Sequence, residues 1–210
     1  MANACGFSSW RQDVRAALSA TVGGLILLVT ACATSGPPPV QYVLGTDQAP
    51  PSAVNPVRGR QVVEVRPVRL PEYLDTRDLL VRKGNQLIPS MTGQWAERLS
   101  VGMTRALALA LGPQLPNAAL FTTEPVQRPA RQLLVDVTSF EARGDHEVIL
   151  TARWTFTDGA GRNALLSQDT VLVEPTGSTS DEAVVNAMNK AVEALASQIA
   201  ASIKRGVPMA

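Results

Sequence analysis

The clearest alternation of apolar and polar residues runs from position 133 to position 173. Its central stretch places five apolar side chains on one face of an extended chain: Val148, Leu150, Ala152, Trp154 and Phe156. A period of two with one apolar face predicts a half-buried β-strand. The stretches 133–137 and 164–173 predict flanking strands, and turns containing glycine at 144–145 and 158–161 join them as hairpins. The pattern therefore predicts three consecutive antiparallel strands.

Two segments have the three-to-four-residue apolar spacing of amphipathic helices. The first, 92–111, has Trp95 at the start of its apolar stripe and ends at Gly112-Pro113. The second starts at Thr179, which stands three residues before Glu182 as in a capping box. Its apolar stripe consists of Val184, Met188, Ala191, Leu195, Ile199 and Ile203.

Shorter apolar runs predict further strands. The run 62–70 contains Pro67, and a proline inside a strand predicts an edge position or a bulge. Apolar runs at 79–82 and 86–88 flank a Lys-Gly-Asn turn and predict a tight hairpin, and 119–122 predicts a short strand. Together with the two long helices, these strands predict one α+β domain with a mixed, mainly antiparallel sheet.

The amino terminus has the pattern of a signal peptide. A positively charged region precedes an apolar run at 16–29, and the small residues Thr30 and Ala31 stand directly before Cys32. The five residues ending at Cys32 resemble the lipobox of bacterial lipoproteins, in which the cysteine thiol receives a diacylglyceryl group before cleavage. A transmembrane span is one alternative, although its serine, threonine and glycine residues weaken it. A chance cysteine, such as Cys5, is another.

The lipobox interpretation divides the chain into three parts. Residues 1–31 are a lipoprotein signal peptide, residues 32–60 are the lipidated Cys32 and a proline-rich tether, and residues 61–206 are the α+β domain. Within the tether, 41–45 is either a short first strand or an apolar interruption. Cys5 leaves with the signal peptide and Cys32 is acylated, so no disulfide forms and the domain depends on its core.

Charge excludes some partners. Removal of Arg11, Arg15 and Asp13 with the signal peptide takes 19 basic and 18 acidic residues to 17 of each, so the mature chain is neutral. A nucleic-acid partner is therefore not expected. Because no run of basic residues is present, membrane binding depends on acyl chains carried by Cys32.

Few residues offer catalytic chemistry. The single histidine, His146, follows Gly144 and Asp145 in a predicted turn and is expected to be solvated. Asp136 and Glu141 lie five apart on one predicted strand, hence on opposite faces, which argues against an acid–base pair. Neither a Gly-x-Ser-x-Gly motif nor a metal-ligating cluster is present. The sequence predicts no catalytic site, no metal and no cofactor.

Two tryptophans stand out because aromatic residues make up only 4% of the chain. Trp95 and Trp154 both lie on predicted apolar faces, which favours a place in the core. The alternative is that one of them lines a groove for an acyl chain or a partner.

Three groups of motifs, in order, resemble a known family. They are the run from Val62 through Val68 and Leu70-Pro71 to Tyr73-Leu74-Asp75, then Asn85-x-Leu87 with Trp95-Ala96-Glu97-x-Leu99, and then Leu133-x-Val135-Asp136-Val137-x-x-Phe140 with Leu150-x-Ala152-x-Trp154. Combined with the lipobox, this order is similar to that of the PqiC-type, ABC-transport auxiliary lipoproteins. The similarity extends from Tyr42 to Ile203.

The resemblance implies a mixed sheet with helices, similar to the amino-terminal domain of TolB, and no catalytic residues. It implies an outer-membrane lipoprotein, anchored through Cys32 and facing the periplasm, that helps to move lipids between membranes and preserves envelope integrity. The implied partners are an MCE-domain protein that spans the periplasm and an ABC-type or integral inner-membrane component. Homo-oligomers are also implied. Ala33, in place of aspartate after the cysteine, agrees with export to the outer membrane.

The segment 70–75 supports two interpretations. It lacks periodicity and carries apolar residues between predicted strands, so it is either a connector that covers the sheet edge or a contact for the bridging partner through Tyr73 and Leu74.

Other functions compete with a transport accessory. An outer-membrane activator of a peptidoglycan synthase also combines a tether with a small domain, but a tether of 28 residues (33–60) spans about 90 Å at ~3.3 Å per residue, which is short for crossing the cell wall. A lipid carrier that encloses acyl chains would need an internal apolar cavity. A hydrolase is the fourth possibility.

Overall fold

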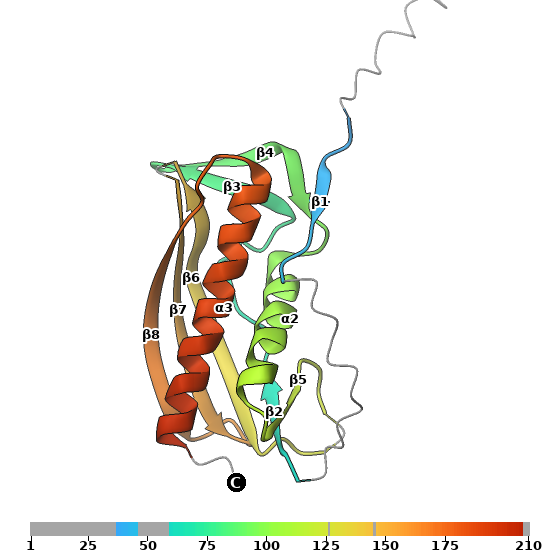
Figure 1. The fold of residues 1–210 in the computed structure, drawn as a ribbon. Helices are drawn as coiled ribbons and strands as arrows, with labels where there is room; N and C mark the ends of the chain where they lie inside the picture. The colour runs from blue at the N-terminus through green and yellow to red at the C-terminus, as the bar shows by residue number, and fades with distance from the viewer. Residues whose placement is uncertain (1–36, 46–58, 126, 145, 208–210) are drawn as a thin grey trace, which may run out of the picture. The chain divides into compact units, whose positions relative to one another are not determined.

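The computed structural model describes residues 37–45, 59–125, 127–144 and 146–207. From Pro39 onward these residues belong to one compact unit, drawn in Figure 1. Its elements, in chain order, are β1 (Val40–Tyr42), β2 (Gln61–Val65), β3 (Asp78–Lys83), β4 (Gln86–Trp95), α2 (Leu99–Leu111), η1 (Gly112–Gln114), β5 (Ala118–Phe121), β6 (Arg131–Arg143), β7 (Glu147–Asp158), β8 (Ala164–Pro175) and α3 (Asp181–Gly206). The predicted α+β class is confirmed.

Strand β6 is the centre of the eight-stranded sheet. Along one edge it pairs antiparallel with β7 from Arg131 to Arg143, and β8 follows β7. Along its other edge the start of β6 pairs with β2 and its end pairs with β3, both in parallel. Strand β5 extends the sheet beyond β2, whereas β4 and β1 extend it beyond β3. The predicted hairpins β3–β4, β6–β7 and β7–β8 are confirmed.

A β-bulge divides β6 into two halves. The register with β7 shifts between Val137 and Ser139, so Thr138 is an extra residue. The buried apolar residues accordingly change from odd positions (Leu133, Val135 and Val137) to even positions (Phe140 and Ala142). Asp136 and Glu141 therefore lie on the same face of the sheet. The expectation of opposite faces was wrong, because strict alternation assigns a face by residue number and the extra residue of a bulge shifts that number by one.

Both helices cover one face of the sheet (Figure 1). The predicted apolar stripe of α3 is completely buried and packs in a single core with β6 and β7. Trp95 and Trp154 both lie in this core, as their apolar faces predicted. Burying a large apolar side chain stabilises a fold by about 1.5–3 kcal/mol, so these helix–sheet contacts hold the two layers together.

The first helix is shorter than predicted. Residues 92–95 end β4, and the last three of them pair in parallel with β1, so Trp95 is a strand residue and α2 begins at Leu99. Strand β1 overlaps the short strand expected at 41–45. The predicted strand at 62–70 ends at Val65, before Pro67. In α3 the capping residue is Ser180 instead of Thr179, since the Ala183 amide donates to the Ser180 hydroxyl at 3.3 Å.

Strand β4 passes over the start of α3. The hydroxyls of Ser90 and Thr92 donate to Oδ2 of Asp181, at 2.8 and 2.7 Å. Between β4 and this carboxylate there is no space for a side chain at Gly93. A Cβ atom there would lie 2.6 Å from Asp181 Oδ2 and 2.8 Å from Tyr42 Cε2.

We expect Gly93→Ala to lower the free energy of unfolding by about 1–3 kcal/mol, the usual cost of overpacking. The methyl group must displace either Asp181 or Tyr42 of β1. Denaturant unfolding followed by circular dichroism measures the change. Gly144→Ala is the matched control, because that glycine does not have a positive φ and the nearest atom to its added methyl group, Lys83 Cγ, lies 3.9 Å away. An equal loss in both variants would contradict this account of Gly93.

Candidate functional site

The described part of the protein begins after Cys32, so the acylation of that residue stays a prediction. The chain enters the sheet at Val40, where β1 starts. Only residues 33–39 separate the predicted lipid from this strand.

The connector between β2 and β3 follows the edge of β6 between the places where these two strands pair with it. Arg66 donates its amide to the Leu133 carbonyl, and the Arg69 amide donates to the Val135 carbonyl, at 2.9 and 3.0 Å. An isolated parallel bridge joins Arg69 to Asp136. The connector therefore continues the path of β2 alongside β6 before it turns away from the sheet at Pro71.

The turn of the connector caps helix α2. Arg98 is the residue directly before the helix, and its side chain makes no capping hydrogen bond. Instead, the Leu99 amide donates to the Thr76 carbonyl at 3.2 Å, and the Ser100 amide donates to Asp75 Oδ1 at 3.0 Å. Two amides left unpaired by the helix geometry are thus satisfied from a segment more than 20 residues earlier in the chain.

Opposing effects act on the Asp75 carboxyl. Partial burial alone would raise its pKa, but the Ser100 amide and hydroxyl and the Arg98 guanidinium together hold the pKa below its ordinary value. Arg98 Nη2 lies 2.6 Å from Asp75 Oδ2. The carboxylate is therefore a charged cap at the helix N-terminus, where a negative charge is stabilised.

Tyr73 and Leu74 lie in different environments. Leu74 is buried and belongs to the core, so its side chain is not available to a partner. That removes Leu74 from the predicted contact. Tyr73 is 40% exposed, and its ring lies 5.7 Å from the Arg82 guanidinium carbon. Arg82 also pairs with the buried Glu141, which fixes the guanidinium under the ring.

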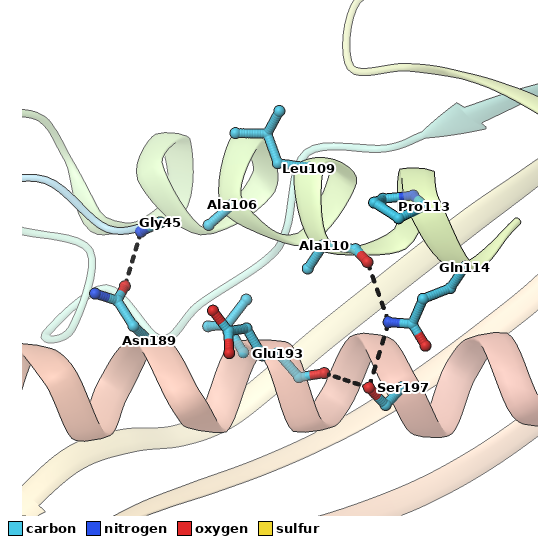
Figure 2. A pocket seen from close by; sticks show the side chains of 10 residues that line it. Gly45, Ala106, Leu109, Ala110, Pro113, Gln114, Asn189, Glu193 and Ser197 are labelled. Carbon is cyan, nitrogen blue, oxygen red and sulfur yellow. Dashed lines mark hydrogen bonds between the residues drawn. The ribbon is translucent and has the colours of Figure 1, made fainter. Parts of the chain in front are cut away.

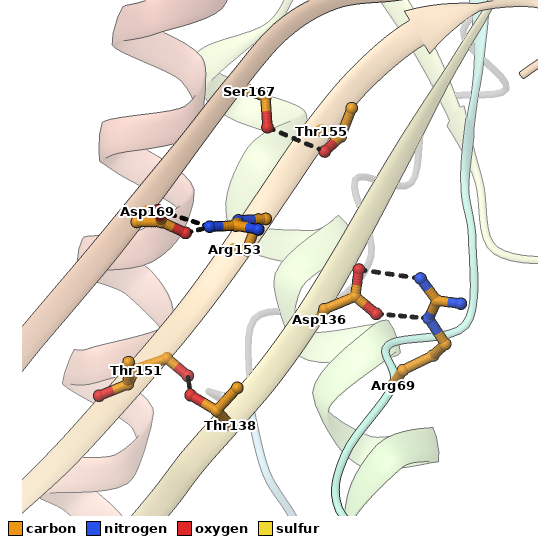
Figure 3. Close-up of polar contacts among 8 residues, drawn as sticks. All are labelled: Arg69, Asp136, Thr138, Thr151, Arg153, Thr155, Ser167 and Asp169. Atoms are coloured by element: carbon orange, nitrogen blue, oxygen red, sulfur yellow. Dashed lines mark hydrogen bonds and ion pairs between the residues drawn. The ribbon is translucent and has the colours of Figure 1, made fainter. Parts of the chain in front are cut away.

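The face of the sheet opposite the helices is mostly polar. Asp136, Arg153 and Asp169 are cross-strand neighbours on β6, β7 and β8, and Arg69 pairs with Asp136 at one end. Charges of alternating sign therefore cross this open face, as Figure 3 shows. Hydrogen bonds from Arg153 lower the pKa of Asp169. Such exposed pairs contribute little to stability.

Apolar side chains also lie on the open face. Val171 and Val173 of β8 are exposed, and Val173 is the cross-strand neighbour of Ile149. Strand β8 forms an edge of the sheet for its whole length, and its only strand partner among the described residues is β7. Exposed apolar residues beside a free edge are suited to contact with another protein.

On the other side of the molecule, a groove of about 300 Å³ lies between α2 and α3. Figure 2 shows its two helical walls. Ala106, Leu109, Ala110, Pro113 and Val192 supply apolar surface. Asn189 accepts the Gly45 amide at 2.8 Å, and Gln114 donates to the Ala110 carbonyl and the Ser197 hydroxyl. The groove is at the lower limit of ligand-pocket size, and Asn189, Gln114 and Ser197 on its walls already bond within the protein.

The described residues contain no group of three or more side chains able to hold a metal ion. None of their helices is long and apolar enough to cross a membrane. His146 is exposed in the β6–β7 turn, with a positive φ of 65°. The surfaces with distinctive chemistry are therefore the connector, the open sheet face and the helix groove.

The family described as ABC-type transport auxiliary lipoprotein component matches residues 42–200. This range includes most of the sheet, α2 and all but the last turns of α3. The chain belongs to this family. The resemblance found in its motifs is thereby confirmed, and with it the role of a lipoprotein accessory to transport. A comparison with curated proteins finds no match.

Solved structures share the fold. An uncharacterised protein covers 80% of this chain with 99% of its own, at 18% identity and a TM-score of 0.67. Protein XCC0632 from Xanthomonas campestris, of the family DUF330, covers 77% of this chain with 90% of its own, at 16% identity and a TM-score of 0.59. At these identities the likeness concerns the fold alone.

The sequence interpretation singled out Tyr73, whose role as a contact stays a prediction, but missed the groove and the capping role of Asp75. Asp75 stands beside Tyr73 and Leu74 in a recognised motif, and an aspartate before a helix is a known capping signal. It could not be assigned because the helix it caps starts 24 residues later. The groove depends on how two helices pack, which no local pattern records.

We expect Asp75→Ala to lower the free energy of unfolding by about 1 kcal/mol at neutral pH, the usual cost of losing a helix cap. Because the pKa of Asp75 is lower in the folded chain, its carboxylate stabilises the fold fully at pH values above the pKa of the unfolded chain, which is near 3.8. That contribution is lost as the pH falls through the folded pKa. Denaturant unfolding at a series of pH values measures the difference between the two proteins.

Glu72→Ala, in the same connector and exposed, is the control and should leave stability nearly unchanged. A difference between the protein and Asp75→Ala that stays constant down to the lowest pH would contradict the charged-cap assignment.

Proposed function

We propose that this protein is an outer-membrane lipoprotein, anchored by an acylated Cys32 and facing the periplasm. In that position it serves as a non-enzymatic accessory of an intermembrane lipid transport system. Its partners are an MCE-domain protein that spans the periplasm and an ABC-type inner-membrane component. This role supports envelope integrity.

Membership of the transport auxiliary lipoprotein family carries the proposal. The match extends over nearly the whole domain, and the lipobox precedes it at Cys32. The described surfaces agree with an accessory role: an exposed tyrosine over an arginine, an open sheet face and a free sheet edge are features that bind proteins.

The position of β1 favours a domain held close to the membrane. Seven residues, 33–39, separate Cys32 from Val40. Eight residue steps span at most about 29 Å. This reach is far shorter than the about 90 Å that a tether of 28 residues (33–60) could span. An activator of a peptidoglycan synthase must reach through the cell wall from its anchor. The short tether therefore favours the transport accessory over that alternative.

The groove between the helices bears on the lipid-carrier alternative. A carrier would enclose acyl chains in an apolar cavity, whereas this groove is open and has Glu193, Asn189 and Gln114 on its walls. The protein is therefore proposed to position other components, not to carry lipid itself.

Cys32→Ser should abolish acylation and, because acylation precedes cleavage, leave an uncleaved precursor that no longer reaches the outer-membrane fraction. The thiol is the proposed site of the thioether to diacylglycerol, and a serine cannot form it. Mass spectrometry of the amino-terminal peptide and sucrose-gradient fractionation measure both effects. An unmodified Cys32 in the native protein would refute the anchor.

The same pair of proteins tests the partner. Crosslinking in native membranes followed by pulldown should recover an MCE-domain protein with the acylated form and less of it with Cys32→Ser. Recovery of a peptidoglycan synthase in its place would contradict the transport role and favour the activator.

Tyr73→Ala should reduce recovery of the MCE-domain protein while leaving the free energy of unfolding nearly unchanged, because the side chain is on the surface. Leu165→Ala is a matched control, since Leu165 is also 40% exposed but lies in β8. Unchanged recovery with folded Tyr73→Ala would rule out the tyrosine as a contact.

A further inference from the structure

Exposed apolar side chains lie along β4 and at the start of β1, at the end of the domain that the tether joins. Met91 of β4 is 89% exposed, Val40 of β1 is 56% exposed and Ile88 of β4 is 44% exposed. Val40 pairs with Gly93, two residues after Met91. Strand spacing places the backbones of Val40 and Met91 within about 10 Å of each other.

The orientation of β1 determines which end of the domain the tether joins. Because β1 and β4 are parallel, the chain preceding Val40 meets the sheet on the side of Gly93 that leads to Met91. Asp181, the first residue of α3, bonds to Ser90 and Thr92 at this end. Figure 1 shows β1, β4 and the start of α3 together at the upper end of the domain.

Tether length and domain length fix which end can meet the membrane. Helix α3 has 26 residues and is therefore about 39 Å long. The attachment point lies at most about 29 Å from the acylated cysteine. The domain therefore cannot stand on the far end of α3, whereas the end that carries Val40, Ile88 and Met91 can reach the lipid surface.

The charge of the β3–β4 hairpin suits a lipid surface. From Leu79 to Ala96 the chain has two basic residues and no acidic residue, and because Arg82 pairs with Glu141, Lys83 supplies the positive charge of this hairpin. Basic groups next to exposed apolar side chains are the combination that binds the interface of a membrane containing anionic lipids.

We propose that Val40, Ile88 and Met91, with Lys83 at the hairpin turn near Ile88, form a second membrane contact on the lipid surface in which Cys32 is anchored. This inference depends on the acylation of Cys32 proposed above. It holds the long axis of the domain away from the membrane and directs the turns at the far end of α3 toward the periplasm.

The test uses the full mature protein, acylated and reconstituted into vesicles of phosphatidylethanolamine and phosphatidylglycerol. Because the acylated Cys32 has no free thiol, Pro89→Cys provides a unique site for an environment-sensitive fluorophore between Ile88 and Met91. Vesicles that contain brominated phospholipid quench a fluorophore in contact with lipid. We expect a blue shift and a loss of emission at position 89.

Arg162→Cys is the control position. Arg162 is exposed in the β7–β8 turn, and Gly206, at the end of α3, lies close to Leu166 in the strand that follows this turn. A fluorophore there should show neither the shift nor the loss. A second control combines Ile88→Asp and Met91→Asp with the label at position 89. These substitutions should restore the emission, while the tether stays unchanged.

Three results would overturn the proposed membrane contact. They are an absence of quenching at position 89, equal quenching at positions 89 and 162, and quenching that persists in the double aspartate variant. A shift that appears in detergent without lipid and grows with protein concentration would assign these residues to contact with a second copy.

Vesicle flotation and the mass of the amino-terminal peptide report the anchor separately. Flotation without quenching at position 89 overturns the membrane contact and leaves the proposed anchor intact. Absence of the acyl group overturns both.

Discussion

The pairing of β6 on both edges is the constraint on which the rest of the fold depends. On one edge β7 pairs with it along its whole length, and on the other edge β2, Arg69 and β3 follow one another in parallel. Parallel neighbours cannot be joined by a tight turn, so the chain reaches β6 only after the β3–β4 hairpin, α2 and β5. That detour places α2 on the same face of the sheet as α3.

The interval between β2 and β3 joins the sheet to the helical layer. The chain leaves β6 after Arg69, places Leu74 in the core and presents Tyr73 at the surface. One residue later, the Asp75 carboxylate satisfies an amide of α2. A contact surface at Tyr73 is therefore held by the same bonds that start the helix. Movement of the tyrosine backbone would cost the capping interaction, which makes this segment a rigid feature and not a loose loop.

Local patterns predicted the elements whose own residues determine their structure. The β6–β8 meander and α3 have long, regular periods, and both were predicted with bounds close to those observed. The start of α2 was not, because Trp95 and Leu99 stand four apart and fit the helical stripe equally well. Trp95 belongs to a strand because it pairs with Tyr42, which lies 53 positions earlier. The bulge at Thr138 and the cap from Asp75 are invisible in sequence for the same reason: each depends on a partner element far along the chain.

The short span between Cys32 and Val40 gives the surfaces a direction. With Cys32 acylated as proposed, the end of the domain at β1 faces the membrane and α3 extends away from it. The open sheet face and the helix groove both run along α3, on opposite sides of the domain, so each can meet a partner that approaches from the periplasm. The row of alternating charges on the open face is internally neutral, so it does not select a strongly charged partner. On that face, Val171, Val173 and the free edge of β8 are the features suited to recognition, because an exposed edge can bind an extended segment through backbone hydrogen bonds.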